Sequence, residues 1–212
     1  MERKEILSTY SDYLLDHQER PKSMHHFAKH LEIDEQDIYA HFASFEAMEV
    51  NIMANLVENV VDLTVEQAQN DHTFSEPRVQ MVTFYLTFVE VLKANRSLVL
   101  LLLPKGAEQL QAWKNLKSAK KVFLAYVKAL DINAEALSFI PSDQIKEKTV
   151  EVAAWSQFKI ILAFWMQDDS VDFERTDIFI EKSLKLSFDI SDSTILHSIV
   201  DLGKFVARHE KT

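Results

Sequence analysis

Cysteine is absent from this sequence, and glycine and proline are rare, with 2 and 4 copies in 212 residues. A chain without cysteine has no disulfide, no thiolate metal site and no cysteine nucleophile, and this composition is typical of a reducing cytoplasm. So few glycines leave little room for hairpin turns or phosphate-binding loops. We therefore expect a cytoplasmic protein built from helices.

Long apolar runs are also missing. The longest apolar stretch, 98–104, is much shorter than the ~20 residues that a membrane span requires, and the N-terminal segment lacks the apolar run of a signal peptide. A hydrophobic fraction of 47% is nevertheless enough to form a packed core. We expect a soluble protein that does not span a membrane.

Apolar residues recur at helical spacing along almost the whole chain, with no internal repeat and no β-like alternation. Ser23, Asp34 and Ser44 stand where N-caps are expected. No element is assigned to residues 131–141. The predicted helices cover residues 2–17, 24–31, 34–42, 44–69, 77–94, 97–103, 107–130, 142–166, 173–190 and 192–209.

Three of these helices are short and fall within the first 45 residues, with a turn of three to four residues between the second and the third. This arrangement is typical of a helix-turn-helix. The segment 23–48, SMHHFAKHLEIDEQDIYAHFASFEAM, resembles the DNA-binding segment of the TetR family. Within it, residues 38–42, Ile-Tyr-Ala-His-Phe, match that family's Leu-Tyr-x-His-Phe, and Phe27-Ala28 stand for its Ile-Ala.

The resemblance implies an all-α, TetR-like fold, with a three-helix DNA-binding domain over residues 1–45 and a larger ligand-binding and dimerisation domain over residues 46–212. It also implies a homodimeric transcriptional regulator, a repressor and not an enzyme. Such a protein binds operator DNA and responds to a small apolar or amphipathic ligand, with no cofactor. The implied DNA-binding residues are Lys22, Ser23, Gln36, Tyr39 and His41.

The role of Tyr39 is open at this point. Its hydroxyl can contact a phosphate oxygen, which would position the protein on DNA without reading its sequence. Alternatively, Tyr39 and Phe42 together lock the core of the three short helices.

Three features depart from the family pattern. Glu32 replaces the glycine of the turn, which argues against the usual positive φ there, because glycine adopts that conformation freely. Phe45 replaces a lysine that contacts the DNA backbone. The predicted recognition helix begins Asp-Glu-Gln-Asp at residues 34–37, and residues 1–45 carry five basic and nine acidic side chains, a net charge of −4 before five histidines are counted. Carboxylates suit a helix N-terminus but repel phosphates, as does the overall charge of −10.

A second pattern points to a different function. Residues 168–179 read Asp-x-Ser-x-Asp-Phe-x-x-Thr-x-x-Phe, which is similar to a pattern in the lipid-binding accessory proteins of ubiquinone biosynthesis. Those proteins share the TetR fold, bind lipid in place of DNA and add a final amphipathic helix, for which the predicted helix 192–209 is a candidate. Similar turns occur in ordinary TetR-like regulators. The alternative function is a TetR-fold protein that binds lipid or isoprenoid and has lost DNA binding.

Large apolar side chains of the body are candidates for the lining of a ligand pocket, with ordinary core packing as the alternative. They are Met53, Met81, Tyr85, Phe88, Trp113, Phe123 and Tyr126.

The predicted helix 142–166 is apolar around most of its circumference, which indicates a second partner beyond its own domain. We predict a homodimer with an isologous four-helix interface, although the helix 192–209 could instead cover this surface. The predicted interface residues are Trp155, Phe158, Leu162 and Trp165.

Metal and catalytic sites are not predicted. His26 and His30 are one helical turn apart, which suits a shared metal, but no further ligand motif accompanies them and a solvated helix face is favoured. The acid pairs Asp168-Asp169 and Glu35/Asp37 have no nucleophile or metal partner in the sequence, and helix-end charges explain them better than general acid–base catalysis.

Overall fold

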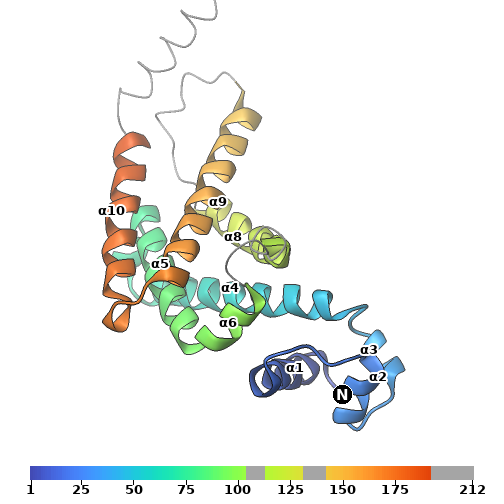
Figure 1. Cartoon of the computed structure of the whole chain (residues 1–212). Helices are drawn as coiled ribbons and strands as arrows, with labels where there is room; N and C mark the ends of the chain where they lie inside the picture. The colour runs from blue at the N-terminus through green and yellow to red at the C-terminus, as the bar shows by residue number, and fades with distance from the viewer. Residues whose placement is uncertain (104–112, 131–141, 192–212) are drawn as a thin grey trace, which may run out of the picture. The chain divides into compact units, whose positions relative to one another are not determined.

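The computed structural model describes residues 1–103, 113–130 and 142–191. Within these residues the chain forms helices and no strands, so the prediction of an all-α fold is confirmed (Figure 1). The α-helices are α1 (Arg3–His17), α2 (Met24–His30), α3 (Glu35–Tyr39), α4 (Phe45–Asn70), α5 (Pro77–Ala94), α6 (Arg96–Leu102), α8 (Lys117–Ala129), α9 (Asp143–Gln167) and α10 (Glu174–Ser191). Short 3-10 helices are η1 (His72–Phe74), η2 (Trp113–Leu116) and η4 (Val171–Phe173).

Most predicted helix bounds agree with the structure to within two residues, and those of α5 agree at both ends. The predicted helix 34–42 is shorter, because α3 ends at Tyr39 and Phe42 lies beyond it. Residues 113–116 form the 3-10 helix η2 ahead of α8, where a continuous α-helix was expected. The predicted helix over 192–209 and the start of the one over 107–130 lie outside the described residues. None of the described helices has both the length and the apolar character needed to cross a bilayer.

The chain divides into two compact units, Met1–Leu63 with Phe88–Phe123, and Thr64–Thr87 with Leu124–Thr212. The three short N-terminal helices therefore belong to the same unit as the first two-thirds of α4. Below, "the head" denotes residues 1–45, the predicted DNA-binding domain.

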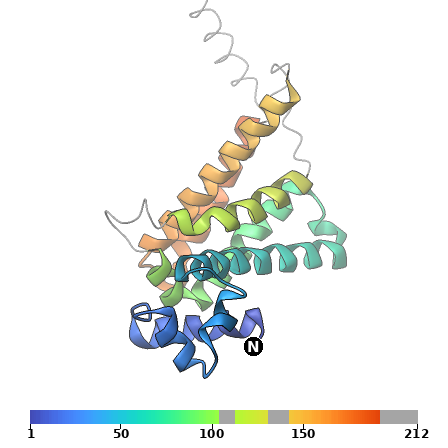
Figure 2. The same ribbon diagram turned by 90° about the vertical axis from the view of Figure 1, so that its right-hand side faces the viewer.

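The short helices of the head lie close together in the ribbon view of Figure 2, and aromatic rings form their core. The Tyr10 ring lies edge-on to Phe27, with centroids 5.4 Å apart, and stacks on Phe45 at 5.3 Å. Ile38 and Phe42 are buried beside them. Phe45, which replaces the backbone-contacting lysine of the family, thus contributes to this core, because its ring joins α4 to α1 and α2.

Glu32 corrects one prediction, because its φ is 56° despite its side chain. Glu32 N–H donates to the carbonyl of Lys29, and Ile33 N–H donates to that of Ala28. These two bonds form the Schellman motif that ends many helices and places its C′ residue in the left-handed region. A residue with a Cβ pays roughly 1–2 kcal/mol for this conformation, and the two hydrogen bonds at the end of α2 offset that cost.

In the second unit, α9 and α10 contact each other and run in opposite directions, joined by the short segment that contains η4 (Figure 1). Phe164 and Phe179 stack between them with centroids 4.4 Å apart. The start of α5 and the end of α8 also belong to this unit, and there the rings of Phe84 and Tyr126 stack at 5.3 Å. Trp165 and Phe158 are fully buried.

Candidate functional site

All five predicted DNA-binding residues are exposed on the head: Lys22, Ser23, Gln36, Tyr39 and His41. They lie just before α2, on α3 and directly after α3. The Ser23 hydroxyl accepts a hydrogen bond from His26 N–H at 3.1 Å, so this side chain caps α2 as expected. The other four side chains are accessible to solvent, and that of Tyr39 is hydrogen-bonded to Glu35.

The exposed fractions of Tyr39 and Phe42 distinguish between the two roles considered for Tyr39, a phosphate contact or a place in the core. Phe42 is 2% exposed and belongs to the core of the head, whereas Tyr39 is 51% exposed. Partial desolvation and the Glu35 carboxylate raise the pKa of Tyr39, which keeps its phenol a neutral hydrogen-bond donor at neutral pH. The position of Tyr39 is therefore compatible with a phosphate contact.

The first turn of α3 carries acidic side chains on its exposed surface. Asp34 occupies the N-cap position, as predicted, but its side chain makes no cap hydrogen bond. Asp37 is exposed and Glu35 is half-buried, with its Oε2 3.8 Å from Nδ1 of His25. Among the described residues no group of three or more His, Asp or Glu side chains is arranged to hold a metal ion.

A buried carboxylate on α4 joins three other segments of the first unit. Glu49 is 4% exposed, and its two oxygens accept four hydrogen bonds. Arg20 Nε donates to Oε1 at 2.6 Å and its Nη2 to Oε2 at 2.7 Å, in bidentate geometry. The Tyr10 hydroxyl donates to Oε1 at 3.1 Å, and Asn115 Nδ2 donates to Oε2 at 3.2 Å. Arg20 also pairs with Glu46 through Nη1.

The contacts in this network raise the pKa values of Arg20 and Tyr10. Hydrogen bonding to Glu49 raises the pKa of Arg20 despite partial burial. Burial and the adjacent Glu49 carboxylate raise the pKa of Tyr10, which stays a neutral donor. Asn115 also donates to the carbonyl of Leu102 at 3.1 Å. The loop before α2, the start of α4 and the end of α6 are therefore connected through one carboxylate.

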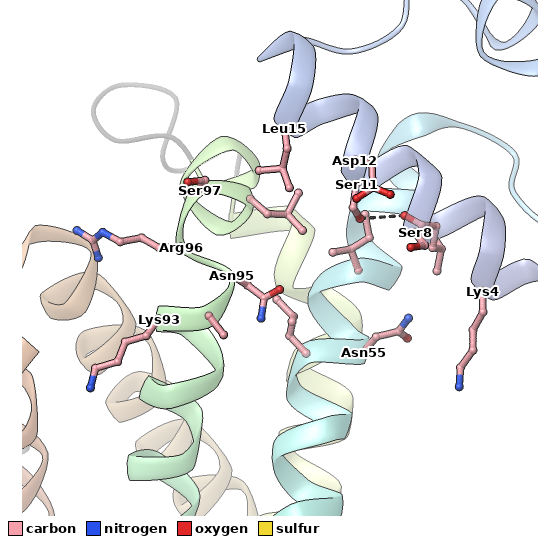
Figure 3. Close-up of a pocket in the computed structure, with 15 residues that line it drawn as sticks. Lys4, Ser8, Ser11, Asp12, Leu15, Asn55, Lys93, Asn95, Arg96 and Ser97 are labelled. Carbon is pink, nitrogen blue, oxygen red and sulfur yellow. Dashed lines mark hydrogen bonds between the residues drawn. The ribbon is translucent and has the colours of Figure 1, made fainter. Parts of the chain in front are cut away.

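A cleft of about 590 Å³ lies in the first unit among α1, α4 and the junction of α5 with α6 (Figure 3). Leu7, Ile52 and Leu98 are buried apolar residues of its wall. Charges of both signs line it, and in Figure 3 the side chains of Lys4 and Lys93 lie at opposite sides. Lys93 pairs with Glu90 at 2.7 Å. Its charged lining residues are Lys4, Lys93 and Arg96 against Asp12, and together with the apolar wall they give the cleft an amphipathic lining.

The predicted pocket residues do not line this cleft. All are buried except Trp113, which is half-buried. Four of them belong to the first unit (Met53, Phe88, Trp113 and Phe123) and three to the second (Met81, Tyr85 and Tyr126). Burial raises the pKa of Tyr85 and of Tyr126, so both phenols are neutral donors. A ligand pocket among these residues stays a prediction.

Three of the four predicted dimer-interface residues, Phe158, Leu162 and Trp165, are buried by their own chain. Trp155 is half-buried and stacks on Phe158 with centroids 5.0 Å apart. The helix α9 is apolar on several faces, but most of its large aromatic side chains lie in the core of their own chain. The amino-acid composition of the helix could not reveal this. The exposed apolar side chains of this helix pair are Ile145, Val152 and Ile160 on α9 and Ile178 and Leu186 on α10.

The Asp-x-Ser…Thr segment forms a capped turn between α9 and α10. Asp168 Oδ1 accepts hydrogen bonds from the backbone and hydroxyl of Ser170, at 2.9 and 2.7 Å. Its Oδ2 accepts from the backbone and hydroxyl of Thr176, at 2.9 and 2.6 Å. Burial raises the pKa of Asp168, but these four bonds outweigh it and lower the pKa to about 2. This segment accordingly has a structural role at the start of α10.

Sequence reasoning missed the network around Glu49. The available signal was an acidic residue between Met48 and Val50, both buried, near the start of an apolar helix. That position indicates a buried carboxylate, but the sequence does not identify Arg20 or Asn115 as its partners. They lie 29 and 66 residues away along the chain.

Replacing Arg20 by Met should lower the free energy of unfolding by about 3 kcal/mol, because it leaves the Glu49 carboxylate buried without its main partner. Urea unfolding at neutral pH measures the loss. The matched control is Arg175→Met, which breaks an exposed ion pair with Asp169 and should cost about 0–1 kcal/mol. Equal losses for the two variants would contradict a buried, structure-determining pair.

The Asp168 carboxylate should make stability depend on pH. Its folded pKa lies below the unfolded value, so its contribution of about 2 kcal/mol is complete above about pH 4 and is lost as pH falls toward 2. The difference in unfolding free energy between the wild type and Asp168→Asn should therefore be about 1 kcal/mol smaller at pH 3 than at pH 7. Asp169→Asn, at an exposed neighbour, serves as control. A wild-type-to-variant difference that does not change with pH would refute this role.

Comparison with known proteins agrees with the fold. Residues 80–206, more than half of the chain, match the family model described as "Tetracyclin repressor-like, C-terminal domain". No curated protein matches the chain significantly. The matched region does not overlap the segment 23–48 that resembles the DNA-binding part of the same family. On these grounds, the chain belongs to the TetR family.

Proposed function

We propose that this protein is a transcriptional regulator of the TetR type, a non-enzymatic repressor that binds operator DNA as a homodimer and responds to a small apolar or amphipathic ligand. The observation that carries the proposal is the division of residues 38–42 between core and surface. Ile38 and Phe42 are buried, whereas Tyr39 and His41 are exposed together with Gln36. A helix-turn-helix requires this pattern, since its second helix must both anchor the head and present side chains to a groove.

The Schellman motif at Glu32 supports the same proposal. It ends α2 and begins the turn to α3 with two backbone hydrogen bonds, so the turn forms here without the family's glycine. Tyr39 and Lys22 would contact phosphates, and Gln36 and His41 would lie near base edges.

The response to a ligand would pass through α4. This helix begins with Phe45 at the head and continues without interruption to Asn70. A ligand that displaces Met53 or its neighbours in the body would tilt α4. In a dimer, the two recognition helices must be about 34 Å apart to meet successive major grooves, so a small tilt changes the affinity for DNA.

We place the dimer interface on the exposed apolar side chains of α9 and α10, in place of the buried aromatic residues named from sequence. Val152 and Ile160 are 57% and 56% exposed, and Leu186 is 60% exposed. Two copies of this helix pair related by a two-fold axis would form a four-helix interface, which would remove these side chains from water.

A lipid- or isoprenoid-binding protein without DNA affinity is the second candidate. The acidic first turn of α3 and the replacement of lysine by Phe45 favour it. The turn at Asp168 favours neither candidate function, because its side chains cap α10. Native mass spectrometry of gently purified protein should then show a bound lipid, and liposome flotation should carry the protein. An empty protein that does not float would exclude this candidate.

The DNA-binding proposal is tested by a gel-shift or anisotropy titration with the gene's own upstream DNA at low salt and at about pH 6. We expect binding at micromolar protein or below, and about tenfold weaker binding for Tyr39→Ala, which corresponds to about 1.4 kcal/mol. Val171→Ala, at an exposed position between α9 and α10, should bind like the wild type. Absence of any wild-type complex at micromolar protein would refute the proposal.

The dimer proposal is tested by light scattering coupled to size exclusion. Val152→Asp with Ile160→Asp should reduce the mass from twice that of the chain to that of one chain, because charges cannot be buried at an apolar interface without a partner. Val171→Asp carries a new charge on the same unit and should remain dimeric. A dimer that survives the double substitution would place the interface elsewhere.

A further inference from the structure

Histidine is concentrated in the head. Five of the eight histidines of the chain lie within its first 45 residues: His17, His25, His26, His30 and His41. All five are exposed. The same residues have a net charge of −4 when the imidazoles are neutral, and of +1 when all five are protonated. A change of histidine protonation therefore inverts the sign of the charge that the head presents to DNA.

Three of these imidazoles surround one tyrosine. The Tyr13 ring stacks on His17 with centroids 4.0 Å apart, and it lies edge-on to His30 at 5.2 Å and to His26 at 6.4 Å. His17 and His30 are themselves 6.5 Å apart. Because these rings are exposed, water screens the repulsion between neighbouring imidazolium charges.

A fourth imidazole acts directly on the recognition helix. His25 Nδ1 lies 3.8 Å from Glu35 Oε2, which is in the first turn of α3. When His25 is protonated, this contact becomes an ion pair and neutralises one of the carboxylates that repel phosphate. His41 follows α3 directly and is among the residues proposed to meet DNA.

The charged surroundings of the cluster are mostly acidic. Arg20 is bound to Glu46 and Glu49 of α4. The other charged side chains of residues 1–45 are Glu2, Glu5, Asp12, Asp16, Glu19, Glu32, Asp34, Glu35 and Asp37, against Arg3, Lys4, Lys22 and Lys29.

We propose that the affinity of this protein for DNA is controlled by pH, and that protonation of the head histidines under mildly acidic conditions converts the head from a surface that repels DNA to one that attracts it. The proposal rests on the proposed DNA-binding function and adds its regulation. Histidine is the side chain whose charge changes between pH 5 and 8, and each added positive charge near a phosphate increases affinity in a salt-dependent manner.

The test uses the full chain and a duplex of random sequence, about 30 base pairs long so that two half-sites fit, labelled with a rhodamine whose emission does not depend on pH. Anisotropy titrations at low salt are run at about pH 6 and about pH 8, with circular dichroism at both values to verify folding. We expect binding to be at least about tenfold tighter at the lower pH, and this difference to shrink as salt is added.

Two variants test whether the histidines of the head cause this pH dependence. Replacement of His17, His25, His26 and His30 by Gln should remove most of the pH dependence and leave only the part due to His41, which stays available for DNA. The matched control is His72→Gln, which removes an exposed histidine of η1 outside the head and should keep the full effect. A second variant, His26→Arg with His30→Arg, carries permanent charge and should bind at pH 8 at least about tenfold more tightly than the wild type.

The outcomes separate this inference from the function on which it rests. Equal affinity at both pH values, or a pH dependence as large in the four-fold Gln variant as in the wild type, overturns the histidine switch and leaves DNA binding intact. No binding at either pH by the wild type or by the Arg variant overturns the proposed function itself, and the switch with it.

Discussion

Burial of one carboxylate, that of Glu49, is the constraint on which the arrangement of the head depends. Glu49 lies near the start of α4 and is almost inaccessible to water, and an ionised carboxylate without partners in such a place costs several kcal/mol. Its four hydrogen bonds come from α1, the loop before α2 and η2, so these three segments must be in place at the same time. The pair made with Arg20 is bidentate, which fixes orientation as well as distance. A movement of α4 would therefore also displace the loop that leads into α2, as the proposed ligand response requires.

Several acidic side chains of this protein form hydrogen bonds that stabilise its helices, which helps to reconcile a charge of −10 with the proposed DNA binding. Glu2 and Glu5 form a capping box at the start of α1, and Asp168 holds the first turn of α10 through Ser170 and Thr176. These carboxylates are occupied by donors of their own chain. Asp34 differs, because it makes no cap hydrogen bond. It leaves a negative charge on the surface proposed to meet DNA.

Much of the fold could be predicted from the sequence, because helical periodicity, Ser23 and Ser44 as caps, and the matched residues 38–42 all specify local structure. The predictions that failed concern features that depend on tertiary contacts. The positive φ of Glu32 depends on hydrogen bonds from a Schellman motif, which glycine content does not report. The three apolar residues Phe158, Leu162 and Trp165 could not be divided between core and interface, since all sides of α9 carry apolar residues. The partners of Glu49 are distant in sequence, so no local sequence pattern identifies them. The exposed position of Tyr39, by contrast, follows from the spacing that buries Ile38 and Phe42.

Selection of genomic DNA fragments by the purified protein, at mildly acidic pH and low salt, tests the central claim that the acidic head reads DNA. The account predicts that sequencing of the bound fragments reveals an inverted repeat, with half-sites separated by about one helical turn or a multiple of it, since a two-fold dimer presents two recognition helices. Protein with Tyr39→Ala should enrich the same repeat more weakly. Bound fragments in which no sequence is enriched over the input would contradict the claim.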